Sequence, residues 1–396
     1  MSPLRLLAFT ATTALGAGMD AQLAALREGR GGLRRCDYPR IDLATWIGRV
    51  EGVEAVVLPP ALACFDCRNN RLAWLALAQD DFRAAVALAR ERFGAERVGV
   101  FIGTTTSGIQ STEDAYRARD PITQDLPRDF DYRHTHNGFS IADFVRTGLG
   151  LRGPAQSVLT ACSSSAKVFG VAQRHIAAGL CDAALVGGSD SLCLTTLYGF
   201  NALQLVSSSP CKPWDGARDG LSLGEAAGFA LLAPAAAGDT GLALLGFGES
   251  ADAHHLSAPH PDGLGAVLAM RQALASAGFQ PQDIDYINLH GTGTPANDAA
   301  EDKAIQAVFG DRVPCSSTKG WIGHTLGAAG IVEALFAGLA IRHRFLPGTL
   351  NTRAIDPALS AQLLLENRAA RPRHAMSNSF GFGGNNCALV IGELDG

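Results

Sequence analysis

The sequence predicts a layered α/β fold made of two similar halves. Short apolar stretches with strand character alternate with longer stretches of helical periodicity along the 396 residues, which is typical of layered α/β proteins. Both halves contain a strand, then a junction rich in Ser, Thr and Gly, and then a helix that begins with small residues. This repeated order indicates an internal duplication.

The first half is expected to contain a buried strand at its start and a helix that begins beside Cys162. The residues that follow Cys162 show the apolar spacing of one helix face. These apolar positions are Val168, Val171, Ala172 and Ile176. The expected strands are 5–10, 98–103, 157–161 and 183–186, and the expected helices are 20–29, 70–93 and 162–179.

The second half repeats this order more loosely. The expected elements are a helix over 266–278, a strand over 285–289 that ends at His290, and a small-residue helix over 327–343. A stretch of small residues at 233–241 separates the two halves. We therefore predict an N-terminal half over 1–238 and a C-terminal half over 239–396.

Composition restricts the class of protein. The net charge is −5 and the pI is about 6.1, which does not favour a nucleic-acid partner, because such proteins carry a strong basic excess. The 9 cysteines are odd in number and scattered, so we expect reduced thiols and a cytoplasmic location. No apolar run reaches the ~18–20 residues of a membrane span. The apolar start, residues 1–18, is interpreted as a first strand rather than a signal peptide.

Cys162 is the strongest candidate for a nucleophile. It stands where a predicted strand meets the first turn of a helix, and free N–H groups and the helix dipole favour an anion there. A cysteine in that position can have a lowered thiol pKa, and the thiolate is the nucleophile. The small serines that follow leave room for a substrate carbonyl. A structural core cysteine is the alternative, and the local pattern alone leaves both open.

Two histidines occupy matching junctions in the second half. His290 follows the predicted strand over 285–289, and His324 precedes the small-residue helix. Ligand sites gather at the ends of strands in such folds. Either histidine alone would be interpreted as a structural residue. The pair on equivalent junctions favours a catalytic site.

None of the common metal or nucleotide motifs is complete. Cys64 and Cys67 form a CxxC pair without a second pair of ligands. The glycines after His290 lack the third glycine of a dinucleotide fingerprint, and neither a P-loop nor GxSxG occurs. Further histidines at 134, 136, 254, 255 and 260 have no carboxylates at ligand spacing. We therefore expect neither a metal nor a cofactor.

Several segments together resemble one enzyme family. They are TACSSSAKVFG around Cys162, PWDGARDGLSLGEAAG from Pro213, HGTGTPANDAAE from His290, SSTKGWIGHTLGAAGIVEA from Ser316 and SNSFGFGGNN from Ser377. With these motifs the chain resembles the β-ketoacyl-acyl-carrier-protein synthases of the I/II type, over about residues 5–390. These are the condensing enzymes of fatty acid and polyketide synthesis.

The resemblance implies a fold and a reaction. The fold is the thiolase fold, with two βαβαβαββ halves in five layers, α-β-α-β-α, and normally a dimer. In the reaction, Cys162 accepts an acyl group from a carrier protein, malonyl on the carrier protein loses CO2, and the resulting carbanion attacks the Cys162 thioester. The partners implied are acyl- and malonyl-loaded carrier protein and a second ketosynthase-like subunit.

The resemblance also assigns roles to further residues. His290 and His324 stabilise the enolate through N–H donors, and the backbone N–H groups of Cys162 and Phe382 form the oxyanion hole. Lys319, with Glu333 as its ionic partner, supports the site. The polar cluster of Asn288, Glu333, Ser377 and Asn378 is either a site for water or a cation, or a closed hydrogen-bond network.

Two surfaces follow from the same likeness. Thr106, Phe200 and Phe382 are expected to line the acyl pocket, with Thr106 at the position of a bulky gate in many relatives. Arg68 and Arg71, beside a predicted helix start, are candidates for docking an acidic carrier protein. The alternative for both arginines is an ordinary solvated helix face.

The motifs also bear on one subgroup and on three rival classes of protein. DLATWIGRVEG from Asp42 is similar to synthases of aryl-polyene pigment pathways, which implies polyene acyl chains and a partner that lacks the cysteine. A non-catalytic subunit is disfavoured by Cys162 and both histidines. A degradative thiolase needs a C-terminal CxG, but Ala388 and Leu389 follow Cys387. A type III synthase uses one histidine. Chain length, saturation, pathway and the identity of the dimer partner are left open.

Overall fold

The computed structural model describes residues 1–395, and strands from both halves form its centre. The long strands are β1 (Leu4–Thr13), β5 (Val98–Gly103), β6 (Ala155–Val158), β7 (Ala183–Asp190), β9 (Ala226–Pro234), β10 (Thr240–Ala251), β15 (His374–Gly381) and β16 (Asn385–Asp395). The short strands are β2 (Gly16–Ala17), β3 (Leu33–Arg35), β4 (Trp46–Gly48), β8 (Leu223–Gly224), β11 (Tyr286–Asn288), β12 (Cys315–Ser316), β13 (Phe345–Leu346) and β14 (Arg368–Ala369).

The two halves have the same strand topology. The hydrogen-bonded path runs β12-β11-β15-β16-β10-β1-β9-β7-β5-β6. Numbered along the chain within each half, five strands lie in the order 3-2-4-5-1, with parallel pairing among strands 2, 3 and 4 and antiparallel pairing beyond. The halves join where β1 pairs with β10 through Leu4 and Leu244. The predicted duplication is therefore confirmed in the topology.

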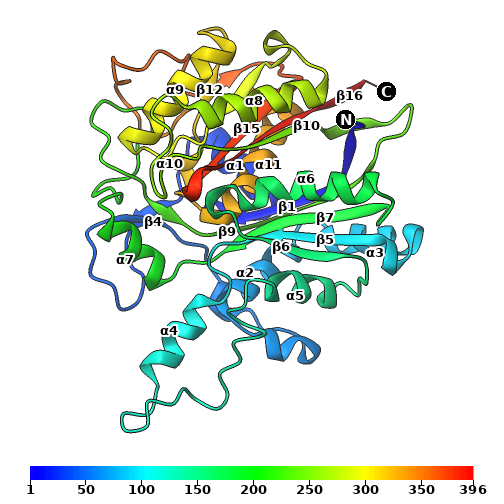
Figure 1. Cartoon of the computed structure of the whole chain (residues 1–396), viewed down its shortest axis with the longest axis vertical. Helices are drawn as coiled ribbons and strands as arrows, with labels where there is room; N and C mark the ends of the chain where they lie inside the picture. Colours follow the sequence, from blue (N-terminus) through cyan, green and yellow to red (C-terminus); the bar gives the residue numbers. More distant parts are fainter. Residues whose placement is uncertain (396) are drawn as a thin grey trace.

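Each half of this path forms a sheet of five strands. Helices cover the outer faces of the two sheets and fill the space between them (Figure 1). They are α1 (Met19–Glu28), α2 (Arg68–Leu77), α3 (Phe82–Phe93), α4 (Ile109–Arg117), α5 (Ser140–Gly148), α6 (Ser164–Ala177), α7 (Leu194–Ala202), α8 (Leu264–Ala277), α9 (Pro295–Phe309), α10 (Lys319–Ile322) and α11 (Ala329–His343). α6 and α11 pack on each other between the sheets, α2, α3 and α5 cover the first sheet, and α8 with α9 covers the second. This gives the five layers α-β-α-β-α.

α11 is the central core helix. All its residues from Ala329 to Ile341 are buried, because its apolar side chains face a sheet or α6 on every side. Contrary to the expectation from the sequence, one stretch, Leu326–His343, is long and apolar enough to cross a membrane, but 89% of it is buried inside the protein. Its hydrophobicity is thus explained by its place in the core.

Most predicted elements are found, with two differences in the first half. The helix predicted over 70–93 is two helices, α2 and α3, because Asp80 and Asp81 adopt left-handed backbone conformations with φ of 54° and 52°. Aspartate visits that region more readily than most residues. The strand predicted over 157–161 ends at Val158, and a 3-10 turn follows.

The predicted boundary between residues 238 and 239 falls in the connection from β9 to β10. Asp239 in this connection is tied to β1 by an ion pair with Arg5 at 2.9 Å. The division into halves at this position stays a prediction.

Candidate active site

Two similar turns carry Cys162 and His324, and His290 follows β11. The nucleophile turn, residues 160–164, follows β6 and starts α6, and the histidine turn, residues 324–328, starts α11. Ala161 and Leu326 have φ of 51° and 54°, a strained conformation for residues other than glycine that costs ~1–3 kcal/mol. In each turn this left-handed residue bends the backbone directly before the helix begins.

Cys162, His290 and His324 come together at this interface, as the sequence predicted. Nε2 of His324 lies 3.0 Å from Sγ of Cys162. The rings of His290 and His324 are 5.4 Å apart between centroids and nearly perpendicular. All three residues are at most 5% exposed. One sulfur and two imidazoles therefore face a single reacting volume.

The thiol of Cys162 is harder to ionise than the sequence suggested. Burial raises its pKa to about 11, although the charge of Lys319 and the backbone N–H of Phe382 both lower it. The expectation of a lowered pKa is thus wrong, because desolvation of a buried thiolate outweighs these groups. Cys162 is therefore a neutral thiol in the resting site, and Nε2 of His324 lies in direct contact with it.

Lys319 fixes the ring of His290. Its ammonium lies 3.3 Å from Nδ1 and 2.5 Å from the backbone oxygen of His290, and it pairs with Glu333 at 2.5 Å. An ammonium can only donate, so Nδ1 accepts and the proton of the neutral ring stays on Nε2. Burial raises the pKa of Glu333 to about 7, and Lys319 counteracts this rise.

The backbone of His324 is anchored by β8. Its N–H donates to the Ser222 oxygen at 2.7 Å, and the Gly224 N–H donates to the His324 oxygen at 3.0 Å. These two bonds fix the backbone of His324, the first residue of the histidine turn.

Neutral burial of the two histidines predicts a pH-dependent stability. Burial, together with the charge of Lys319, holds the pKa of both His290 and His324 well below 6.5. Below pH ~6.5 these histidines bind protons in the unfolded chain but not in the folded chain. Their contribution to stability is therefore fully present above pH ~6.5 and is lost as the pH falls below it. In urea denaturation at pH ~7.5 and ~5.5, His290→Gln should show a shallower decline than wild type. The exposed His255→Gln should follow wild type, and equal slopes for all three would contradict neutral burial.

A small cavity of about 80 Å³ opens over the three residues. Phe200 and Phe382 line it and stack with ring centroids 5.5 Å apart. Thr106, contrary to expectation, is not among its lining residues: it is 2% exposed and its hydroxyl donates to Asp190 at 2.8 Å. A hydroxyl so deep in the protein needs an acceptor, and Asp190 supplies it.

Glu301 is a positioning residue that the sequence analysis missed. It accepts the backbone N–H groups of His290 and Gly291, both at 2.8 Å, and the side-chain amide of Asn378 at 3.2 Å. Burial raises its pKa to about 7, and the two backbone N–H groups lower it. Glu301 is the last letter of the motif HGTGTPANDAAE, where its position on the second turn of α9 resembles an ordinary surface acid.

The predicted polar cluster is buried beside the site. Asn288 and Ser377 are register partners on β11 and β15. Within residues 1–395, Asn288 Oδ1, Glu333 Oε2, Ser377 Oγ and Asn378 Oδ1 have no hydrogen-bond partner. This disfavours a closed network, and one carboxylate with neutral oxygens suits water or a hard cation. The nature of the occupant stays a prediction.

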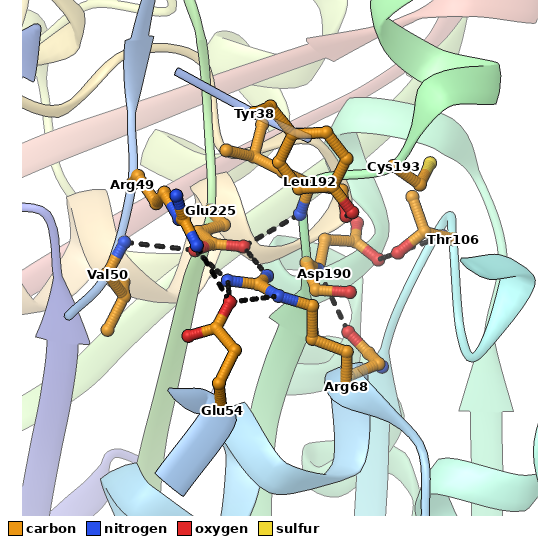
Figure 2. Close-up of polar contacts among 12 residues, drawn as sticks. Tyr38, Arg49, Val50, Glu54, Arg68, Thr106, Asp190, Leu192, Cys193 and Glu225 are labelled. Atoms are coloured by element: carbon orange, nitrogen blue, oxygen red, sulfur yellow. Dashed lines mark hydrogen bonds and ion pairs between the residues drawn. The ribbon is translucent and has the colours of Figure 1, made fainter. Parts of the chain in front are cut away.

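The prediction for Arg68 is wrong, because its side chain is buried rather than available for docking. It is 7% exposed and forms a bidentate pair with the fully buried Glu225, and Glu54 lies 3.1 Å away at the edge (Figure 2). A guanidinium always carries its charge and needs such partners inside a protein. Arg71 is 34% exposed and pairs with Asp66 at 2.6 Å, so it alone stays a docking candidate.

The fold and the site define a condensing acyltransferase: a duplicated five-layered fold that brings one buried cysteine and two neutral histidines to a shared cavity. Family models described as the N-terminal and C-terminal domains of β-ketoacyl synthases match residues 71–237 and 243–353. The chain belongs to the β-ketoacyl synthase family, and it has the thiolase fold of that family.

Relatives and solved structures agree with this assignment. The 3-oxoacyl-acyl-carrier-protein synthase 2 of Rhizobium meliloti (strain 1021) is 40% identical over 318 residues, 75% of this chain and 74% of the relative. The mitochondrial 3-oxoacyl-acyl-carrier-protein synthase of Arabidopsis thaliana is 38% identical over 345 residues, 80% of this chain and 73% of the relative. The ketosynthase ApeO from Xenorhabdus doucetiae, solved with its chain length factor ApeC, has a TM-score of 0.90 and 37% identity, and covers 99% of this chain and 98% of its own. The chain is therefore a β-ketoacyl-acyl-carrier-protein synthase.

Proposed function

We propose that Cys162 is the acyl acceptor of the condensation. The supporting observation is the contact between Cys162 Sγ and His324 Nε2 at 3.0 Å, beside His290. In the first step a bond forms from Sγ to the carbonyl carbon of the donor thioester. The carbon–sulfur bond of the donor breaks, and the thiol proton of Cys162 ends on the departing carrier-protein sulfur. The N–H groups of Cys162 and Phe382 hold the oxyanion.

The second step is a decarboxylation followed by carbon–carbon bond formation. Malonyl on a carrier protein loses CO2, and the electron pair of the broken bond forms an enolate. The Nε2–H groups of His290 and His324 donate to the enolate oxygen. The carbanion then attacks the Cys162 thioester, and the released thiolate takes a proton from solvent. Lys319 holds the ring of His290, and Glu333 balances the charge of Lys319.

We further propose that the chain works in a heterodimer with a ketosynthase-like subunit that lacks the cysteine, on conjugated polyene acyl chains. The partner is inferred from the 37% identity and 0.90 TM-score to ApeO, which was solved with its chain length factor. The acyl class is inferred from the likeness of DLATWIGRVEG, from Asp42, to synthases of aryl-polyene pathways. The solved ishigamide ketosynthase/chain length factor, 28% identical, also supports a partner of this kind. A homodimer in fatty acid synthesis is the alternative. Arg71 is proposed for carrier-protein docking, and the cytoplasm is the proposed location.

The test is intact-mass analysis after incubation with a panel of saturated and polyene acyl-carrier proteins. The chain is assayed alone and with a co-expressed cysteine-lacking homologue, and malonyl-carrier protein is then added. We expect a single acyl adduct, CO2 release and an extended product, with the fastest-loading chain naming the substrate class. Loading that is equally fast without the homologue would contradict the heterodimer. No adduct in either form would contradict the role of Cys162.

A further inference from the structure

A loop of three threonines, Thr104–Thr106, follows β5 and lies between the nucleophile turn and the histidine turn. The hydroxyl of Thr105 donates to the backbone oxygen of Ala161 at 3.4 Å, on the nucleophile turn. A Cβ added to Gly327, on the histidine turn, would come within 2.6 Å of the same hydroxyl. The loop thus touches both turns and can set the distance between them.

A single buried carboxylate, Asp190 at the end of β7, holds this loop, and Figure 2 shows its contact with Thr106. It accepts the hydroxyls of Thr104 and Thr106 at 2.7 and 2.8 Å, and the backbone N–H groups of Thr105 and Thr106 at 2.9 Å. Its other oxygen accepts the N–H of Gly327 at 2.5 Å. Asp190 is fully buried, so the loop and the histidine turn are tied to one point of the sheet.

The place where Asp190 meets the histidine turn has a counterpart at Cys162. In each turn the strained residue, Ala161 or Leu326, directly precedes the residue whose N–H lies at the helix start. Gly327 is therefore the topological equivalent of Cys162. Helix starts attract negative charge. The Cys162 N–H is proposed to meet a transient oxyanion, whereas the Gly327 N–H donates to the side chain of Asp190.

We propose that Asp190 is a positioning residue that keeps His324 in contact with Cys162. β8 fixes the chain on one side of His324, and the bond from Gly327 to Asp190 fixes it on the other. The threonine loop carries the same constraint across to the nucleophile turn. The proposal rests on the role proposed for Cys162, but it can be tested without any acyl donor.

Two variants break this arrangement in different ways. Asp190→Asn replaces one oxygen by an amide nitrogen, which then faces N–H donors instead of accepting them, and it removes the negative charge. Gly327→Ala keeps the charge, but its Cβ would lie 2.7 Å from the Asp190 oxygen and 2.9 Å from the backbone of Thr104. Either change should move the histidine turn away from the nucleophile turn.

The measurement is the rate of iodoacetamide alkylation at Cys162, followed by peptide mass spectrometry in the full chain. The exposed thiol of Cys64 serves as the internal reference. Both variants should slow alkylation of Cys162 at least ~10-fold, because small misplacements of reacting groups are costly, and leave Cys64 unchanged. The matched control is Asp302→Asn, a buried carboxylate that accepts the N–H groups of Ser360 and Ala361 and should leave both rates unchanged.

The opposite result would separate charge from position. The negative charge of Asp190 raises the pKa of Cys162, so a purely electrostatic role predicts faster alkylation in Asp190→Asn and no change in Gly327→Ala. That pattern, or unchanged rates in both variants, overturns the proposal. If Asp190→Asn does not fold, Gly327→Ala decides alone. The two proposals can fail separately. If the wild type takes up no acyl group but both variants still slow alkylation, the positioning role of Asp190 is supported and only the role of Cys162 as acyl acceptor is contradicted.

Discussion

Replacement of Cys162 by alanine is expected to abolish the acyl adduct and to lower condensation at least ~10³-fold, the scale seen when a covalent nucleophile is removed. No other thiol can substitute, because Sγ of Cys162 alone has His324 at 3.0 Å among the thiols of residues 1–395. Intact-mass analysis measures the adduct, and product analysis with malonyl-carrier protein measures condensation.

Two observations make this result specific. Cys64→Ala removes an exposed thiol and should retain both the adduct and the activity. Cys162→Ala should still release CO2 from malonyl-carrier protein, because His290 and His324 are anchored independently of the sulfur by Lys319 and β8. An acyl adduct that survives in Cys162→Ala would refute the assignment of the nucleophile.

Glu225→Ala should destabilise the protein by ~3–5 kcal/mol, the cost of leaving a buried charge without its partner. The guanidinium of Arg68 cannot lose its charge, and Glu225 also accepts the N–H groups of Val50 and Leu192 at 2.9 and 2.8 Å (Figure 2). Two guanidinium nitrogens of Arg68 and the backbone N–H groups of Val50 and Leu192 would lose their acceptor at once. Urea denaturation at fixed pH measures the change in the free energy of unfolding.

The matched control removes the other carboxylate that contacts Arg68. Glu54 is 54% exposed, against 0% for Glu225, so Glu54→Ala should cost less than ~1 kcal/mol, as exposed pairs do. Similar losses for the two variants would mean that burial is not what makes the pair strong. A small loss for Glu225→Ala would mean that Arg68 reaches solvent when its partner is removed.

The sequence predicted the position of the site residues correctly where a reactive residue type stands next to a recognisable strand end in one short motif. Cys162 and His290 stand at strand ends, so the strand pattern and the residue type together located them. Glu301 could not be recognised, because its role depends on the backbone N–H groups of His290 and Gly291. The sequence does not show that its side chain points inward to accept them. The pKa of Cys162 was misjudged because local context shows the helix start but not the depth of burial.

Long-range partners explain the other errors. Arg68 lies at a helix start, where an arginine is ordinarily solvated, and its partner Glu225 is 157 residues away. Thr106 was assigned to a pocket from its place in the chain, but its hydroxyl meets Asp190, 84 residues away. Neither pairing leaves a periodic signal, so only the assembled sheets reveal them.

The bond between the Asp190 carboxylate and the Gly327 N–H, at the start of α11, has a consequence for the number of acyl groups that one chain can bind. Of the two equivalent helix starts, one is permanently filled from within by Asp190, and its turn has glycine where the other has sulfur. Each chain can therefore load a single acyl chain, despite its duplicated architecture. A complete titration should reach one equivalent per chain in a homodimer, and one per two chains beside a subunit without the cysteine. Counting bound acyl groups thus reports the composition of the assembly.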